Sequence, residues 1–458
     1  MTWPARIRLR LDVTLCTRLI GFIYLIAFVS WGVQSAGLIG SHGITPAAQF
    51  FQTVLQEYPA TAHWDVPSLF WLNASDGALA AGWIAGALFA LAAMFAPWRW
   101  AIRIALALCL VLWLSICSAG QDFLSFQWDI LLSEAGFLAI FADDSPIRIW
   151  FFRWLIFRLM FFSGVVKLTS GDPNWKNLTA LHYHYETQPL PNPVAWLMGQ
   201  APMWFQKVST AFTFTAELVA PFLFFVPGIG RRLGAWVVIA LQILIFLTGN
   251  YAFFNLLAII LALFLFIEPT KGSRPKSHRS VDAVVGGFIF FVSACLMLQL
   301  FGLSTPGTRT ILRWVEPLRL VNSYGLFAVM TTERQEIIVE GSNDGEHWLA
   351  YEFPYKPGDP RRAPPIVAPY QPRLDWQMWF AALSNYRENR WFVGMMIRLL
   401  QGEHAVLRLF RYNPFPNAPP RFIRARLYLY HFTHFGQAGW WTREERAMYF
   451  PPVGLKQQ

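Results

Sequence analysis

Lys167 occupies the position in this sequence that most directly suggests chemistry. It follows the apolar run RWLIFRLMFFSGVV, so it lies near one end of a candidate membrane span. Partial loss of water there would lower the pKa of the amine, and a neutral lysine can act as a base or a nucleophile. In the alternative, structural role, the side chain extends to the membrane surface and keeps its charge in water. The sequence leaves both roles open.

Two histidines and a glutamate in the loop after Lys167 form a second candidate cluster. His182, His184 and Glu186 share a face if this stretch is extended, whereas His182 and Glu186 pair if it is helical. The spacing could ligate a metal, but no further ligands accompany it, so we expect no metal and no other cofactor. Rings crowded beside a bilayer are also typical of an interfacial belt.

The segments around the cluster must position these side chains. Asp172 followed by Pro173 predicts a helix start, with Asp as the N-cap and Pro in the first position. This helix would cover about 174–182. Lys167 would stand at the end of the span that precedes it.

Five polar residues fall inside segments that are otherwise apolar, where ionisable groups must face protein, water or a partner. They are Asp129, Glu134, Arg158, Glu217 and Asn255. Arg158 is placed to pair with Asp129 or Glu134. These two carboxyl groups are interpreted as structural contacts, or as groups that handle protons or contact substrate. Glu217 and Asn255 are expected to form polar contacts between helices.

Composition sets the class of protein. The 458 residues are 55% hydrophobic and 14% charged, whereas soluble globular chains carry about a quarter charged residues. Mean hydropathy is +0.37. These values exclude a disordered chain, a fibrous chain and an ordinary cytosolic enzyme. They favour a polytopic α-helical membrane protein. The four cysteines lie in or beside apolar segments, which predicts no disulfide framework.

About nine transmembrane helices are predicted from the apolar runs. They lie at about 19–38, 78–97, 101–118, 123–142, 149–168, 208–227, 233–249, 252–268 and 281–303. With the N-terminus inside, twelve basic residues fall in the inner loops: Arg6, Arg8, Arg10, Arg99, Arg103, Arg148, Arg231, Arg232, Lys271, Arg274, Lys276 and Arg279. The outer loops hold only Lys176 and Lys207. This asymmetry follows the positive-inside rule.

Two domains are expected. Residues 1–303 would form the helical transmembrane domain, with an inner N-terminus and long outer loops at 39–77 and 169–207. Residues 304–458 would form a small, mostly-β domain on the outer or lumenal side. Strands are predicted near 336–340, 347–353 and 421–432, with the turn Gly341–Gly345 between the first two and a helix over 374–383.

Several function classes find no support. The sequence holds no G-x-S-x-G, H-E-x-x-H, Walker A or G-x-G-x-x-G motif, and no internal repeat typical of transporters. The net charge of +10 is compatible with nucleic-acid binding. However, the larger basic excess falls in the outer domain, so we expect no nucleic-acid partner and favour membrane lipids or an acidic protein surface.

Long stretches of this chain resemble lipase maturation factors. The resemblance rests on residues 128–139, on RWLIFRLMFFSGVVKL, on TSGDPNWKNLTALHYHYETQPLPNP, on LTGNYAFFNLLAI and on the patterns at 413–416 and 426–430. In animals such proteins lie in the endoplasmic reticulum membrane and are needed for secreted lipases to fold and assemble, and bacterial members also exist. The resemblance implies a chaperone-like function in protein folding and maturation. The partner would be a secreted lipase or another exported client protein.

The resemblance also suggests which loop residues would contact such a client. They are Asp172, Pro173, Trp175, Tyr183, Tyr185, Gln188, Pro189 and Pro191. The compartment would be the endoplasmic reticulum membrane in a eukaryote, or the inner membrane in a bacterium with the C-terminal domain in the periplasm.

A more distant similarity gives an alternative. The segment 164–175 looks similar to a stretch of vitamin K-dependent γ-glutamyl carboxylases, in which a lysine acts as base. This likeness implies an integral membrane enzyme at the outer leaflet, with Lys167 as base and with His182, His184 and Glu186 as further candidates. A third hypothesis is a carrier that uses Asp129, Glu134 and Arg158.

Overall fold

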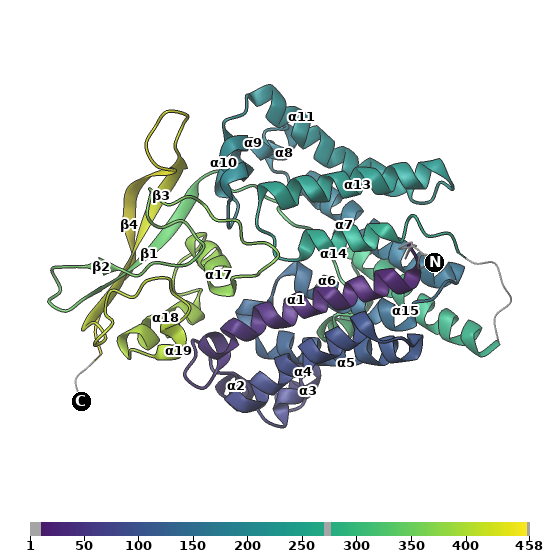
Figure 1. The fold of residues 1–458 in the computed structure, drawn as a ribbon, viewed down its shortest axis with the longest axis horizontal. Helices are drawn as coiled ribbons and strands as arrows, with labels where there is room; N and C mark the ends of the chain where they lie inside the picture. The colour runs from purple at the N-terminus through teal and green to yellow at the C-terminus, as the bar shows by residue number, and fades with distance from the viewer. Residues whose placement is uncertain (1–10, 270–275, 456–458) are drawn as a thin grey trace, which may run out of the picture.

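A bundle of helices runs along the long axis of the molecule, and a small sheet lies at one end of it (Figure 1). The computed structural model describes residues 11–269 and 276–455. Five basic residues used for the orientation, Arg6, Arg8, Arg10, Lys271 and Arg274, lie outside these ranges.

Six helices in the described part of the chain are long and apolar enough to cross a membrane. They are α1 (Val13–Ile39), α4 (Asp76–Phe95), α5 (Arg99–Ala119), α7 (Pro146–Thr169), α13 (Ile229–Thr248) and α15 (Lys276–Leu300). Each coincides with a predicted span. A helix of about 20 consecutive apolar residues is long enough to cross the hydrocarbon core, and it forms its backbone hydrogen bonds internally. The protein is a multi-pass helical membrane protein.

Of the three other predicted spans, two are short helices and the third contains a π-helical turn, so six described helices rather than nine are long and apolar enough to cross a membrane. α6 (Gln127–Phe141) has 15 residues and α14 (Phe254–Leu263) has 10. The segment predicted at 208–227 forms α11 (Met203–Phe214), a π-helical turn at Thr215–Val219 and α12 (Ala220–Leu223). Pro221 cannot donate a hydrogen bond to the preceding turn, and the helix widens just before it.

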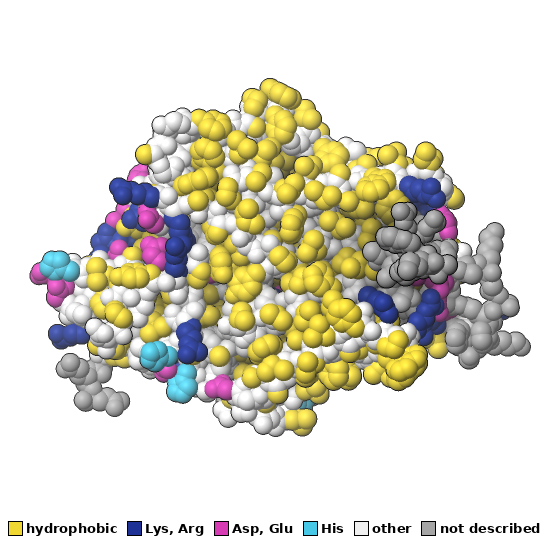
Figure 2. All heavy atoms as spheres, viewed as in Figure 1, with side chains coloured by type: hydrophobic (Ala, Val, Ile, Leu, Met, Phe, Trp, Pro, Cys, Tyr) yellow, Lys and Arg dark blue, Asp and Glu magenta, His cyan; other side chains and the backbone are white. Residues whose placement is uncertain are grey.

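Basic residues from several helices lie at the end of the bundle opposite the sheet, each with its own partner. Arg103 donates to the carbonyl of Ala142 (2.9 Å), Arg148 pairs with Asp282 (2.7 Å), and Arg231 donates to the carbonyl of Leu265 (2.8 Å). Figure 2 shows hydrophobic side chains across the middle of the molecule and charged side chains gathered at its two ends. This banding is what a transmembrane position requires.

The sheet contains four antiparallel strands in the order β2-β1-β3-β4. β1 (Arg334–Ser342), β2 (Leu349–Ala350) and β3 (Phe422–Phe432) coincide with the three predicted strands, and β4 (Trp441–Val453) was not predicted. Residue Glu340 pairs with Ala350 and Ile338 pairs with Arg426, which sets the register.

Helices make up more of this C-terminal part than the prediction of a mostly-β domain allows. α17 (Arg373–Ala382) matches the predicted helix, whereas α16 (Pro306–Val315), α18 (Arg390–Leu400) and α19 (His404–Leu407) are additional. Phe392 of α18 packs edge-on against Tyr449 of β4, with ring centroids 5.1 Å apart. Buried aromatic contacts of this kind cover one face of the sheet and leave the part mixed in α and β.

Buried polar contacts join the C-terminal part to the helix bundle. The backbone amide of Arg373 donates to the Gln34 side chain of α1 (2.8 Å), and the amide of Gln371 donates to Ser30 (2.9 Å). Asn250, between α13 and α14, accepts from the amide of Val367 (2.7 Å). The Pro-rich segment 354–372 is therefore held against the bundle at several points.

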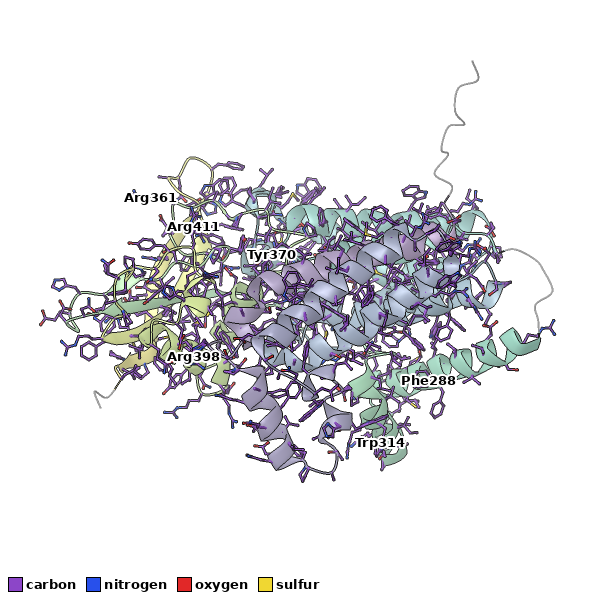
Figure 3. All side chains as sticks on the ribbon, turned by 60° about the horizontal axis from the view of Figure 1, so that its bottom comes forward. Phe288, Trp314, Arg361, Tyr370, Arg398 and Arg411 are labelled. Atoms are coloured by element: carbon purple, nitrogen blue, oxygen red, sulfur yellow. The ribbon has the colours of Figure 1, made fainter. Side chains whose placement is uncertain are left out.

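Short helices occupy the two long loops. The first holds α2 (Ala47–Glu57) and α3 (Ala62–Asp65), and the second holds α8 (Pro173–Lys176), α9 (Ala180–Thr187) and α10 (Pro193–Gly199). Figure 3 shows Arg361 and Arg411 at the sheet end of the molecule and Phe288 of α15 on its flank. The second loop packs against the sheet, where Glu186 accepts from the amide of Phe432, whereas Trp64 of α3 in the first loop donates to the carbonyl of Trp314 of α16.

Candidate functional site

Lys167 forms a buried ion pair with Glu217. Its Nζ lies 2.7 and 2.8 Å from the two carboxylate oxygens and 3.1 Å from the carbonyl oxygen of Ser163. Three acceptors therefore match the three protons of the ammonium group. This geometry is that of a held cation, and it offers no lone pair for the base chemistry suggested by the sequence.

The local backbone explains how Glu217 reaches Lys167. Glu217 lies in the π-helical turn, which carries an extra residue per turn and displaces its side chains relative to a regular helix. Gly164 of α7 faces this turn, and a Cβ there would come within 2.6 Å of Leu218. Glycine at position 164 therefore leaves room for the Leu218 side chain at this contact.

His184 belongs to a hydrogen-bond chain with Tyr251 and Gln188. The Gln188 amide donates to the carbonyl of Thr248 (2.9 Å), so its oxygen accepts the Tyr251 hydroxyl proton (3.0 Å). The His184 Nε2 atom, 2.9 Å from the same hydroxyl, must then carry the donated hydrogen, which leaves Nδ1 as an acceptor. Burial, and then the charge of Lys167, lowers the pKa of His184 to about 4. The imidazole is neutral at physiological pH.

A cavity of about 560 Å³ lies beside these polar groups. α7, α11, α13 and α14 form its walls, and α9 with Leu326 and Phe327 covers one end. We call it the inner cavity. Lys167, Glu217 and His184 are among its polar lining residues, and most of its lining is apolar.

The start of the loop after Lys167 is built as predicted. Asp172 is the N-cap of α8 and accepts from the amide of Asn174 (2.8 Å), with Pro173 in the first turn. Its other oxygen accepts from the amide of Met330 (2.6 Å). Trp175 donates to the carbonyl of Phe327 (2.9 Å). The predicted helix over 174–182 is instead interrupted near Leu178, which has φ +57°.

The predicted histidine cluster is not assembled. His182 is exposed on α9, whereas Glu186 accepts from the amide of Phe432 (2.8 Å) and lies 3.1 Å from His431 of β3. His182 therefore pairs with neither His184 nor Glu186. Within residues 11–269 and 276–455, no group of three His, Cys, Asp or Glu residues is placed to hold a metal.

Most of the loop residues expected to meet a client are covered by the protein itself. Tyr185 packs against the rings of the sheet, while Tyr183 is partly buried beside Trp175. Gln188, Pro189 and Pro191 are buried. The carbonyl of Pro189 accepts from Arg334 of β1 (3.0 Å). This segment fastens the sheet to the bundle, so its buried residues do not form a free contact surface.

The two α6 carboxylates hold the C-terminal part by paired contacts. Asp129 accepts two bonds from Arg373 of α17, at 2.6 and 2.9 Å, and both side chains are fully buried. Arg158 pairs with Glu134, one of the two carboxylates expected as its partner from the sequence, and does not pair with Asp129. Glu134 also accepts from the Tyr324 hydroxyl (2.7 Å). These arrangements favour the structural interpretation over proton transport.

Asn255 fulfils the expected contact between helices. Its side-chain amide donates to Gln242 of α13 (2.8 Å) and so joins α13 to α14. The sequence analysis did not identify several partners of these buried polar groups. They are Arg373, Tyr324, Gln188, Tyr251 and Gln242.

A second hollow of about 550 Å³ lies where the bundle meets the C-terminal part. We call it the aromatic groove, and its lining includes Phe126, Trp128, Trp376, Phe380, Leu383 and Val329. The Trp128 and Trp376 rings lie 4.8 Å apart. Their buried indole N–H groups have no acceptor among the described residues. Val329, Leu383 and Phe380 are 67%, 46% and 41% exposed.

Comparison with known protein families supplies the decisive observation. Residues 12–271 match the family described as lipase maturation factor transmembrane domain, and residues 320–451 match the lipase maturation factor C-terminal domain. The chain belongs to the lipase maturation factor family. It is 36% identical to lipase maturation factor 2 of Homo sapiens, over 94% of this chain and 81% of that protein.

Other members of the family are similarly related. Lipase maturation factor 2 of Gallus gallus is 35% identical, with 94% of this chain and 80% of that protein covered. Lipase maturation factor 1 of Bos taurus is 33% identical, with 98% and 91% covered. No solved structure matches this lipase maturation factor family member. The Asp129–Arg373 pair connects the two family-defined segments of the chain.

Proposed function

We propose that this protein assists the folding and maturation of an exported client, such as a secreted lipase, from its position in the membrane. The names of its relatives support the class of client, and the aromatic groove supports the mode of contact. Incompletely folded chains expose apolar side chains, and such side chains bind to apolar grooves that are open to solvent.

The aromatic groove has the chemistry that an extended client segment requires. Phe126, Trp128 and Trp376 form its buried, rigid floor, and its rim keeps Val329, Phe380 and Leu383 accessible as apolar contacts. The accessible rim is therefore the part of the groove that a bound segment would contact first.

We further propose that the groove and the C-terminal part face the lumen of the endoplasmic reticulum, or the periplasm in a bacterium. The basic helix ends lie at the opposite end of the bundle, which the positive-inside rule places in the cytosol. This orientation would expose the groove to proteins that have crossed the membrane. The groove would then act in a chaperone-like manner.

Charged substitutions at the groove rim test this proposal. Val329→Asp and Phe380→Asp would be expressed in cells that lack the endogenous factor, together with a secreted lipase. Each should lower secreted lipase activity about tenfold at equal membrane abundance, because a charge replaces a contact of about 1.5–3 kcal/mol.

Ile366→Asp is the matched control, since Ile366 is 73% exposed and does not line the groove. This variant should behave as the wild type. Normal lipase activity in both rim variants would contradict a client contact at the groove.

A further inference from the structure

The inner cavity opens sideways onto the apolar surface of the bundle. Three of its lining residues are half or more exposed: Val208 of α11 at 60%, and Leu244 and Leu247 of α13 at 50% and 51%. α11 and α13 separate toward the sheet end of the molecule (Figure 1). Hydrocarbon from a surrounding bilayer can therefore reach the cavity without crossing a polar surface.

The size of the inner cavity limits what it can hold. Its volume of about 560 Å³ is within the range of small-molecule sites. A site of this size takes one hydrocarbon chain with a small head, and the rest of a longer chain continues through the opening between α11 and α13. A phospholipid with two chains does not match a cavity of this size.

The charges at the inner end exclude an ionic head. Lys167 and Glu217 neutralise each other, and the three ammonium protons already have acceptors. No other Lys, Arg, Asp or Glu lines the cavity among the described residues. A phosphate or carboxylate would enter without a counter-charge and lose its hydration, which costs several kcal/mol.

The inner end can instead bind a hydroxyl group. The Nδ1 atom of neutral His184 is an acceptor, and no described residue is within hydrogen-bond distance of it. Ser209 and Thr213 also line the cavity and add hydroxyl groups of their own. A head that donates one hydrogen bond therefore complements this end better than a head that only accepts.

We propose that the inner cavity binds one uncharged single-chain amphiphile. Its hydroxyl-bearing head lies at His184, and its hydrocarbon chain extends between α11 and α13. This site is separate from the aromatic groove, although Tyr251 and Phe327 form part of the wall of both. The inference does not depend on the identity of the client.

Photolabelling of the purified full-length protein in detergent tests the site. The probe is a monoacylglycerol with a diazirine in its chain, competed by unlabelled monoolein, oleate or lysophosphatidylcholine. We expect labelled peptides in α11 and α13, and competition by monoolein at least tenfold better than by the two charged lipids. Equal competition by all three, or uniform labelling of every lipid-facing helix, would overturn the proposal.

Substitutions at the mouth provide the structural control. Val208→Trp and Leu244→Trp should each reduce labelling about fivefold or more, because the larger ring fills the opening. Leu233→Trp should not, since Leu233 is 56% exposed on α13 and does not line the cavity. If both mouth variants label like the wild type, the chain of the probe does not lie between these helices and the proposal fails.

Substitution of the head contact tests its chemistry. His184→Phe keeps a ring of similar shape and removes the acceptor, so monoolein should compete about five- to tenfold less well. Unchanged competition would overturn the placement of the head. If His184→Phe does not fold, labelling of Val208→Trp and Leu244→Trp still shows whether the site exists.

Discussion

The buried pair Asp129–Arg373 should dominate the attachment of the C-terminal part to the helix bundle. Both side chains are fully buried, and the two hydrogen bonds measure 2.6 and 2.9 Å. Arg373→Met leaves the Asp129 carboxylate without its counter-charge, and Asp129→Asn leaves the guanidinium in the same state. Each change should cost about 3–5 kcal/mol, a large part of the 5–15 kcal/mol typical of a folded protein.

The double variant Asp129→Asn/Arg373→Met distinguishes the interaction energy of the two charges from the loss of packing at each site. It removes both charges, so no unpaired charge remains in the interior, and its cost should be no larger than that of either single variant. The difference between this cost and the sum of the single costs should reach about 3 kcal/mol. An exposed pair, Arg99–Asp144 at 3.0 Å, serves as the reference and should contribute less than about 1 kcal/mol.

The free energy of unfolding would be measured in mixed micelles, by titration with a denaturing detergent and tryptophan fluorescence as the readout. Additive costs in the double variant would refute the reasoning, because they would mean that the two charges act independently. Single variants that cost no more than Arg99→Ala would refute it as well, since the pair would then be accessible to solvent.

Three further predictions concern the interior of the protein. Lys167→Arg should keep secreted lipase activity within about twofold at equal abundance, because a guanidinium can also pair with Glu217; loss of activity would instead indicate that Lys167 acts as a base. The lowered pKa of His184, about 4 against 6.5, means that the unfolded chain binds more protons between these values. Stability should therefore fall by about 3 kcal/mol at most as pH drops from about 6.5 to 4. Thermal unfolding of His184→Phe should show a smaller drop over this range, and an equal drop would contradict the assignment. Gly136→Ala should destabilise the protein by about 1–3 kcal/mol, since its Cβ would clash with the Tyr24 hydroxyl; an unchanged unfolding midpoint would show that Tyr24 can move aside.

Local features were predictable because their causes are local. The Asp172 N-cap depends on two adjacent residues, and the long spans depend on runs of apolar side chains. α18 also carried a readable signal, since Phe392, Met395, Met396 and Leu399 recur at helical spacing and are all buried. In contrast, β4 alternates poorly between apolar and polar residues and contains a charged run and two prolines. Its extended conformation therefore depends on pairing with β3 more than on its own sequence pattern.

The partners of the buried charges were not predictable for a different reason. Asp129 and Arg373 are separated by 244 residues, and the sequence contains many arginines at similar distance. Glu217 reaches Lys167 only because the helix widens into a π turn. The residues with unusual placement were identified, but their pairing depends on tertiary packing.

The long-range pairs also place a constraint on the testing of the client hypothesis. Removal of the chain after about residue 303 would leave Asp129 and Glu134 without Arg373, Asn322 and Tyr324. A truncated protein would lose activity through misfolding whether or not its C-terminal part binds a client. Substitutions at the exposed groove rim avoid this difficulty.

The same pairs bear on the order of events during synthesis. α6 emerges from the ribosome 244 residues before Arg373 does, which at 5–20 residues per second is about 12–50 s. Throughout this interval Asp129 has no arginine from α17, and an unpaired carboxylate is poorly tolerated in lipid. Until the last third of the chain has been translated, the membrane part therefore lacks the Asp129–Arg373 pair. The assembly of this family member thus depends on a late, long-range docking step.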